Sequence, residues 1–233
     1  MKIPTGSKIL DRMLEGGYEN DVVTTIYGPA GSGKTILAML CSIVMARSGK
    51  KVIYIDTENS FSIERLKQVA NDYRKVMDNI VFLKPVNFGE QKKAFEKLKD
   101  IVNDKIGLIV VDTIAMLYRI ELGQNQDNAY EINSSLSQQI LYLSEIARNK
   151  NIPVLVTNQV YSNFDEKGKV NIVGGDILKY GSKCLIELQI TPQNNRRLVL
   201  HKHRSIPQER SIYFKIVQTG VLGTKEEKGF KMF

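Results

Sequence analysis

The chain has 233 residues and a formal net charge of +8, and its 42% apolar and 25% charged residues are ordinary proportions for a soluble globular protein. No segment approaches the roughly 20 consecutive apolar residues of a membrane-spanning helix, residues 1–5 lack the apolar core of a signal peptide, and Cys41 and Cys184 lack metal-ligand spacing. These properties exclude a membrane-spanning protein and a disulfide-rich secreted scaffold, and they predict one cytoplasmic domain over residues 1–233.

From residue 22 to residue 159, short apolar runs alternate with amphipathic segments. Runs rich in β-branched residues occupy 22–27, 51–56, 79–83, 107–112 and 152–159. Between them, apolar residues recur at helical spacing over 34–48, 61–75, 89–103 and 128–150. Uniformly apolar strands that alternate with helices predict a parallel sheet covered by helices on both faces.

The pattern changes after Gln159. Residues 160–175 are largely polar and contain glycine, which predicts a loop, and a short helix is expected near 176–183. Apolar and polar residues then alternate over 184–191, 196–201 and 211–217, as they do in half-exposed antiparallel strands. The predicted fold class is α/β, with a mostly parallel central sheet flanked by helices and an antiparallel C-terminal extension.

The segment GPAGSGKT at residues 28–35 satisfies the phosphate-loop pattern G-x-x-x-x-G-K-[ST] at every required position. It follows a predicted strand and opens a predicted helix, which is the context that this motif requires. Its glycines let backbone amides point at the β-phosphate, Lys34 is expected to reach the β- and γ-phosphates, and the Thr35 hydroxyl is expected to ligate Mg²⁺. The motif predicts that ATP with Mg²⁺ is held by Gly28, Pro29, Ala30, Gly31, Ser32, Gly33, Lys34 and Thr35.

The predicted strand 107–112 ends in four apolar residues followed by Asp112. Beside a phosphate loop, an acid at this place is expected to lie next to Thr35 and to orient the water shell of the metal. An acid that ends a strand can also be a helix N-cap or a plain loop residue. No second carboxylate follows, since Thr113 and Ile114 come next, so a base for hydrolysis is expected elsewhere.

Two further polar residues stand at the ends of predicted strands. Glu58 follows the strand 51–56, on the rim where ligands of open α/β sheets bind, and its carboxylate could hold an attacking water. The alternative is that Glu58 only caps a helix that begins near Ser60 or Ser62. Gln159 ends its strand where an amide can contact the γ-phosphate and signal its loss to the next loop. A bond from Gln159 to backbone is the alternative, and spacing does not decide between the two.

Several motifs, read together, carry a family resemblance from residue 5 to about residue 214: TGSKILDRMLEGG, GPAGSGKT, YIDTENSF followed by ERL, LIVVDTIAMLYR, and PVLVTNQV followed by GGDILKYGSK. They resemble the RecA-type recombinases, in the archaeal and eukaryotic branch that contains RadA, and most closely the short archaeal paralogues called RadB. The resemblance implies a RecA-like P-loop ATPase core in which Glu58 is the catalytic glutamate, assisted by Lys34, and Gln159 senses the γ-phosphate. It also implies that Arg65 lies near the adenine.

The same resemblance implies two DNA-binding loops, at residues 119–128 and 160–175. Residues 151–233 contain 13 of the 33 Lys and Arg against 7 of the 25 acids, and such a basic surplus attracts phosphate backbones. Each cation can equally be solvated surface charge. The residues expected near DNA are Arg119, Lys167 and Lys169, with Tyr161 or Phe164 available to hold single-stranded bases.

The sequence departs from the larger recombinases at two places. We expect a chain that consists of the ATPase core, without the helical DNA-binding domain and the polymerisation linker of the full recombinases. Where those relatives carry an acidic segment over a neighbour's ATP, residues 200–205 read LHKHRS. Lys202 and Arg204 are expected to contact phosphate, on DNA or across a subunit interface, although a solvated hairpin would have the same composition.

These features favour an ATP- and DNA-binding accessory protein of DNA repair and homologous recombination, with weak Mg²⁺-dependent ATPase activity and little or no strand exchange. The expected partners are single-stranded DNA, further copies of the chain, and other repair proteins such as a Holliday-junction resolvase. The alternatives are a genuine strand-exchange recombinase and a regulatory RecA-like ATPase of the circadian-clock type that binds no DNA. Relatives of the clock type have two adjacent glutamates after the second strand, whereas here Asn59 follows Glu58, which favours the recombinase side.

Overall fold

The computed structural model describes residues 1–162, 170–191 and 193–224. Its helices are α1 (Lys8–Met13), α2 (Lys34–Arg47), α3 (Ile63–Val69), α4 (Tyr73–Met77), α5 (Phe88–Ile101), α6 (Met116–Gln124), the 3-10 helix η1 (Gln126–Asn128), α7 (Ala129–Lys150) and α8 (Gly175–Gly181). Its strands are β1 (Lys2–Ile3), β2 (Tyr18–Glu19), β3 (Val23–Tyr27), β4 (Lys51–Asp56), β5 (Ile80–Leu83), β6 (Ile106–Asp112), β7 (Val154–Asn158), β8 (Val160–Ser162), β9 (Val170–Ile172), β10 (Cys184–Ile190), β11 (Arg196–Lys202), β12 (Ser211–Val217) and β13 (Gly220–Thr224).

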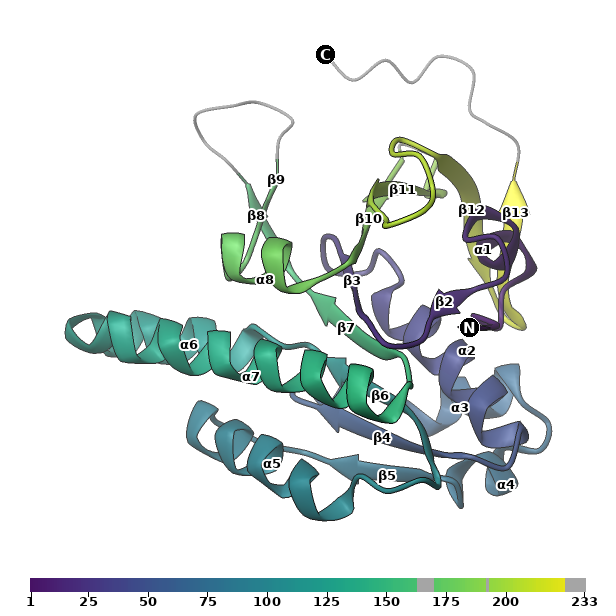
Figure 1. Cartoon of the computed structure of the whole chain (residues 1–233). Coiled ribbons are helices and arrows are strands. Elements are labelled where there is room, and N and C mark those ends of the chain that lie inside the picture. The colour runs from purple at the N-terminus through teal and green to yellow at the C-terminus, as the bar shows by residue number, and fades with distance from the viewer. Residues whose placement is uncertain (163–169, 192, 225–233) are drawn as a thin grey trace.

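A large sheet forms the centre of the molecule, with its strands in the order β13-β12-β11-β10-β3-β7-β6-β4-β5 (Figure 1). The strands from β10 to β5 pair in parallel, and β11, β12 and β13 extend the sheet by antiparallel pairing. The predicted α/β fold class is therefore confirmed. The antiparallel prediction for β10 is right for one edge only, because β10 pairs in parallel with β3 and antiparallel with β11 and so joins the two parts.

Apolar side chains of the parallel strands divide between two cores, one on each face of the sheet. On β4, Val52 and Tyr54 pack in the core that contains α2, whereas Ile53 and Ile55 pack in the core that contains α5 and α7. Successive side chains of a strand point to opposite faces, so a strand buried on both faces must be apolar throughout. Each fully buried aliphatic side chain stabilises the fold by about 1.5–3 kcal/mol relative to exposure.

The register of the parallel strands brings their carboxyl ends together at one edge. Asp56 at the end of β4 lies opposite Asp112 at the end of β6, and Tyr27 at the end of β3 lies opposite Asn158 at the end of β7. In open α/β sheets this edge is where ligands bind. The segments that follow these strands therefore share one site.

Several segments differ from expectation. The helix expected over 61–75 is two helices, because the backbone at Ala70 turns extended (φ −142°, ψ 107°) and ends α3. The first expected loop, 119–128, is largely helical: α6 begins at Met116, buries Leu117 and Tyr118, continues to Gln124, and is followed by η1. The second, 160–175, has paired ends, since β8 and β9 form a hairpin. None of the described helices combines the length and the apolar character needed to cross a bilayer.

Candidate nucleotide-binding site

A cleft of about 380 Å³ opens at the carboxyl edge of the sheet, beside the first turn of α2. It gathers the predicted site residues Lys34, Thr35, Glu58, Arg65, Asp112 and Gln159, which come from five separate segments of the chain. The full lining is Ala30, Gly31, Gly33, Lys34, Thr35, Ile36, Met39, Glu58, Ser60, Ser62, Arg65, Asp112, Thr113, Gln159 and Ile216.

The loop between β3 and α2 has the backbone geometry of an anion cradle. Gly31 (φ +72°) and Gly33 (φ +105°) adopt left-handed conformations that side chains disfavour. At Gly28, a Cβ atom would lie 2.4 Å from the carbonyl oxygen of Leu188. Helix α2 starts directly after Gly33, so its free amides and its positive dipole end face the cleft.

Lys34 is buried at the mouth of this loop. Its ammonium donates to the carbonyl oxygens of Gly28 at 2.8 Å and Pro29 at 2.9 Å. Burial lowers the pKa of Lys34, while the negative charges of Glu58 and Asp112 raise it. The side chain thus has a cationic head with neutral acceptors, which phosphate oxygens can replace.

Asp112 is 1% exposed and accepts hydrogen bonds from three hydroxyl groups. Its Oδ2 accepts from Tyr54 at 2.9 Å and from Ser60 at 2.9 Å, and its Oδ1 accepts from Thr157. Ser60 in turn lies 3.4 Å from the Thr35 hydroxyl, so one side chain separates Asp112 from Thr35. The hydroxyls of Thr35 and Ser60 and the carboxylate of Asp112 are oxygen donors, which is the set that Mg²⁺ prefers.

Sequence reasoning missed Tyr54, Ser60 and Thr157 as neighbours of Asp112. Tyr54 and Thr157 lie inside apolar strands, where tyrosine and threonine are common for packing reasons alone. For Ser60, the sequence suggests only a place near which a helix could begin. The signal for all three is the parallel register of β4, β6 and β7, which the sequence does not give.

Glu58 contacts Gln159 directly. Its Oε1 accepts a hydrogen bond from the Gln159 side-chain amide at 2.7 Å and another from the Thr113 hydroxyl at 2.7 Å. The cap of α3 is Ser62, which accepts from the Arg65 backbone amide at 3.1 Å. Glu58 is therefore not the cap of that helix, and the side-chain amide nitrogen of Gln159 donates to a carboxylate.

Arg65 lines the cleft from α3 and holds the turn between β12 and β13. Its guanidinium donates to the carbonyl oxygens of Val217 at 2.6 Å and Gln218 at 3.1 Å. The same group also donates to Gln68 at 2.7 Å. Arg65 thus bonds a wall of the cleft to the antiparallel extension of the sheet.

Of the cations expected near DNA, Arg119, Lys202 and Arg204 are described, and they are not among the residues that line this cleft. Arg119 is exposed on α6, and Lys167, Lys169 and Phe164 lie outside the described residues. Lys202 donates to the Lys179 carbonyl oxygen at 2.8 Å. Arg204 forms ion pairs with Glu19 at 3.0 Å and Asp21 at 2.9 Å, so its charge is balanced within the chain.

Replacing Arg204 by alanine is expected to lower Tm by about 2–4 °C at pH 7, because the variant leaves the buried Glu19 without its main cationic partner. The loss is taken as roughly 1 kcal/mol, since the arginine is partly exposed and solvent screens the pair. Hydrogen bonds from Arg204 lower the pKa of Asp21. The pairing of Asp21 with Arg204 therefore stabilises the fold above the ordinary aspartate pKa of about 3.9. This stabilisation is lost as the pH falls through the lowered pKa that Asp21 has in the folded protein. Calorimetry should show the Tm difference shrinking below about pH 4.

The matched control for Arg204 is alanine at the exposed Lys97 on α5, which also removes one cation. Its Tm is expected to stay within about 1 °C of the wild type. An Arg204 variant with unchanged Tm and clearly weaker DNA binding would instead support the phosphate contact expected from the sequence.

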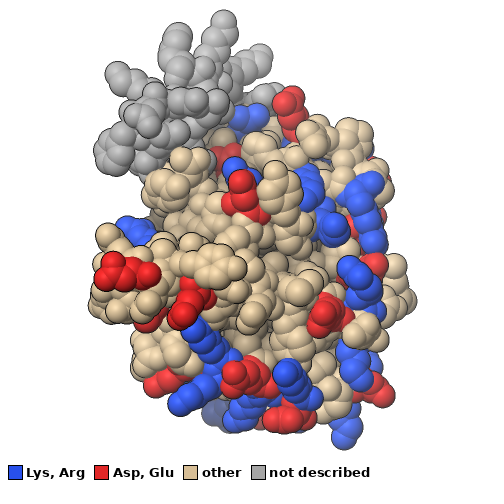
Figure 2. Space-filling model, turned by 60° about the vertical axis from the view of Figure 1, so that its left-hand side comes forward, with Lys and Arg blue, Asp and Glu red and all other residues tan. Residues whose placement is uncertain are grey.

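Charges are mixed on the face shown in Figure 2, where Lys and Arg lie beside Asp and Glu around an uncharged area.

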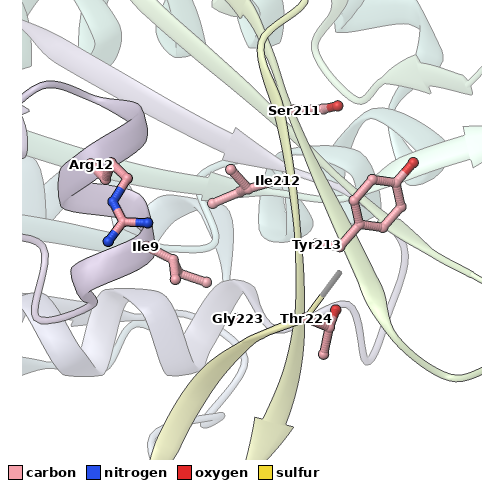
Figure 3. A pocket seen from close by; sticks show the side chains of 7 residues that line it. All are labelled: Ile9, Arg12, Ser211, Ile212, Tyr213, Gly223 and Thr224. Atoms are coloured by element: carbon pink, nitrogen blue, oxygen red, sulfur yellow. The ribbon is translucent and has the colours of Figure 1, made fainter. Parts of the chain in front are cut away.

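A second hollow, of about 620 Å³, lies between α1 and the strands β12 and β13, and Figure 3 shows Arg12 and Ile9 on one side of it and Ile212 on the other. Its lining contains no carboxylate and no phosphate-loop residue: Ile9, Arg12, Ser211, Ile212, Tyr213, Gly223 and Thr224. This second hollow therefore lacks the phosphate loop and the carboxylates that line the cleft at the P-loop.

Comparison with known proteins gives consistent results. The Rad51 family model matches residues 1–224. The DNA repair and recombination protein RadB of Methanobrevibacter smithii is 40% identical over 228 residues, covering 95% of each chain, and that of Methanococcus maripaludis strain C5 is 41% identical over 214 residues, covering 91% of this chain and 96% of the relative. The crystal structure of the RadB recombinase matches with a TM-score of 0.80 and 36% identity over 94% of this chain and 98% of that one. The chain therefore belongs to the Rad51 family of RecA-like proteins, and within it is similar to the RadB proteins.

Proposed function

We propose that this protein is an ATP- and DNA-binding accessory protein of DNA repair and homologous recombination, with weak Mg²⁺-dependent ATPase activity and little or no strand exchange. The family relationship supports a role in repair and recombination. The observation that carries the finer proposal is the hydrogen bond between Glu58 and Gln159 inside the P-loop cleft. It joins the candidate base for hydrolysis to the segment that leads into the β8–β9 hairpin.

The nucleotide site is proposed to use the whole loop from Gly28 to Thr35. Backbone amides of the loop and the first turn of α2 bind the phosphates, and the Lys34 ammonium exchanges its carbonyl acceptors for phosphate oxygens. Thr35 and Asp112 would hold Mg²⁺, directly and through its water shell. The ion would supply neutralisation of phosphate charge.

Glu58 is proposed to hold the attacking water. One oxygen of its carboxylate, Oε1, is occupied by Thr113 and Gln159, and among the described residues no hydrogen bond reaches Oε2. Glu58 also lines the cleft, so Oε2 is the oxygen available to accept a proton from water. A carboxylate held at one oxygen and open at the other suits a general base.

Gln159 is proposed to report the state of the nucleotide to DNA. The main-chain carbonyl oxygen of Gln159 accepts from the Val173 backbone amide at 3.2 Å. The side-chain amide of the neighbouring Asn158 donates to the Val173 main-chain carbonyl oxygen at 2.6 Å. Both bonds fix the base of the β8–β9 hairpin. If the Gln159 side-chain amide binds a γ-phosphate instead of Glu58, the change therefore occurs next to the residues that fix the base of the β8–β9 hairpin.

The proposed partners are single-stranded DNA, further copies of the chain, and other repair proteins such as a Holliday-junction resolvase, in the cytoplasm. Arg119, Lys167 and Lys169 remain the proposed DNA contacts. Lys202 and Arg204 are weaker candidates, because both have partners within the chain. Arg65 is proposed to lie near the adenine, at the wall of the cleft.

The DNA proposal predicts salt-dependent binding. A labelled single-stranded oligonucleotide titrated at several NaCl concentrations with a non-hydrolysable ATP analogue should bind tightest at low salt, with a slope of log Kd against log salt of about 0.7 per phosphate contacted. Absence of binding at 20 mM NaCl would contradict the DNA proposal.

A strand-exchange assay with homologous DNAs should give little product, and robust product would favour a genuine recombinase instead.

A further inference from the structure

Thr113 follows Asp112 at the end of β6 and is 1% exposed. Its hydroxyl donates to Oε1 of Glu58 at 2.7 Å. From the sequence alone, Thr113 shows only that no second carboxylate follows Asp112. In the fold it is a neutral donor aimed at the candidate base.

The backbone around Thr113 is fixed from both neighbouring strands. The Thr113 amide donates to the Thr57 hydroxyl at 3.0 Å, and the Thr57 hydroxyl donates to the Thr113 carbonyl oxygen at 2.7 Å. The next residue, Ile114, donates its amide to the Thr157 carbonyl oxygen at 3.1 Å and accepts at its own carbonyl from the buried Gln91 at 3.0 Å. Thr113 therefore has little freedom to move away from Glu58.

The second donor to the same oxygen is placed differently. Gln159 is half-buried and stands between β7 and the β8–β9 hairpin, where its main-chain partner is Val173. Its side chain lines the cleft and can exchange one acceptor for another without disturbing a strand. Glu58 thus has two hydrogen-bond donors of different kinds. Thr113 is held in place by the neighbouring strands, whereas the Gln159 side chain can change its partner when a nucleotide binds.

We propose that Thr113 is the positioning residue of Glu58: it keeps the carboxylate aimed into the cleft when Gln159 turns to a bound γ-phosphate. This inference rests on the proposed hydrolytic role of Glu58. Without the Thr113 hydroxyl, departure of Gln159 leaves Oε1 without a donor among the described residues, and the carboxylate is free to turn out of line with the water. Misplacement of a reacting group by about 1 Å can cost roughly 100-fold in rate.

The test compares Thr113→Val, which removes the hydroxyl at constant size, with Thr113→Ser, which keeps it. Under saturating Mg·ATP, Thr113→Val should lower kcat by about 10- to 100-fold with the Kd for ATP changed less than about threefold. Thr113→Ser should restore most of kcat. The control is Thr25→Val on β3. It removes a buried hydroxyl that lies 2.7 Å from the Ser182 hydroxyl, and it should leave kcat unchanged.

Two comparisons separate positioning from a general loss of structure. In a Glu58→Gln background, adding Thr113→Val should cause no further fall in kcat, since the group that Thr113 positions is already lost. An additive fall, or full activity in Thr113→Val alone, overturns the proposal. Should Thr113→Val fail to fold, Thr113→Ala removes the hydroxyl without placing a methyl group beside the carboxylate and is expected to repeat the result.

A crystal structure of Thr113→Val with a non-hydrolysable ATP analogue gives a readout that does not depend on turnover. The Glu58 carboxylate should leave the position that it has in the wild-type complex, whereas in Thr113→Ser it should stay. An unmoved carboxylate in Thr113→Val rejects the positioning role. A wild-type protein that binds ATP but never hydrolyses it would reject the ATPase proposal, while these structures would still decide the role of Thr113.

Discussion

Replacing Lys34 by alanine is expected to raise the Kd for Mg·ATP by about 100-fold or more while the protein stays folded. The ammonium is buried and donates to the carbonyl oxygens of Gly28 and Pro29. Burial lowers the pKa of Lys34, and the charges of Glu58 and Asp112 oppose that shift. A triphosphate offers the ammonium anionic acceptors instead of neutral ones, and truncating one partner of a buried charge pair costs about 2–5 kcal/mol.

Fluorescence titration with a labelled ATP analogue in the presence of Mg²⁺ measures this loss. The matched control is Lys50→Ala, which removes an exposed lysine whose ammonium bonds to the Asp104 carbonyl oxygen at 2.9 Å, away from the cleft. Its Kd is expected to equal that of the wild type. An Lys34 variant that binds Mg·ATP normally would mean that the cleft at the P-loop is not the nucleotide site.

The phosphate loop could be predicted because its requirements are local. Gly31 and Gly33 need left-handed backbone, and the lysine and the threonine follow at fixed spacing in the first turn of α2. The same holds for the strand pattern, in which period-2 burial on two faces requires apolar residues at the interior positions of β4 and β6, Val52–Ile55 and Leu108–Val111. Such features depend on few residues that are close in the chain, so one sequence is sufficient to find them.

The contacts that join the site could not be predicted in the same way. Gln159 and Glu58 are 101 residues apart, and their hydrogen bond depends on the order and register of β4, β6 and β7. Thr113 becomes a partner of Glu58 only in that arrangement. A sequence gives candidate side chains at strand ends, whereas the pairing of those ends is a property of the whole sheet.

Charge is the clearest case in which a local interpretation was incomplete. The run HKHR at residues 201–204 indicates a basic patch when it is taken alone. In the fold, Arg204 meets Glu19 and Asp21 from the other end of the chain, and His201 lies 2.6 Å from Glu187. Much of this cluster therefore stabilises the antiparallel extension, because cations near in sequence can be neutralised by acids that are distant in sequence.

The break between α3 and α4 was also beyond the pattern of apolar residues. Helical spacing continues through residues 61–75, yet the chain turns extended at Ala70 and restarts at Tyr73. This break leaves α3 short, with Ser62 as its cap and Arg65 directed at the β12–β13 turn. Tertiary contacts of this kind override intrinsic propensity.

Replacing Glu58 by glutamine is expected to slow ATP turnover by roughly 10²–10⁴-fold while ATP binding is retained. Glutamine keeps the size of the side chain, and its carbonyl oxygen can still accept from Thr113 and Gln159 in place of Oε1. The amide group has no second acceptor to take a proton from water, so only the chemical step should suffer. The expected signature is a low kcat with an unchanged Kd.

Single-turnover hydrolysis with excess protein, together with a titration of the labelled ATP analogue, measures the two quantities for Glu58→Gln separately. The matched control is Glu64→Gln, because Glu64 is 76% exposed and, among the described residues, its side chain pairs only with Lys67 on the surface of α3. That control should hydrolyse ATP at the wild-type rate. If Glu58→Gln retained full turnover, the base would have to be another group. Asp112 is poorly suited to that role, since three hydroxyl donors already occupy its two oxygens. A loss of turnover confined to Glu58→Gln therefore identifies the Glu58 carboxylate as the base for hydrolysis.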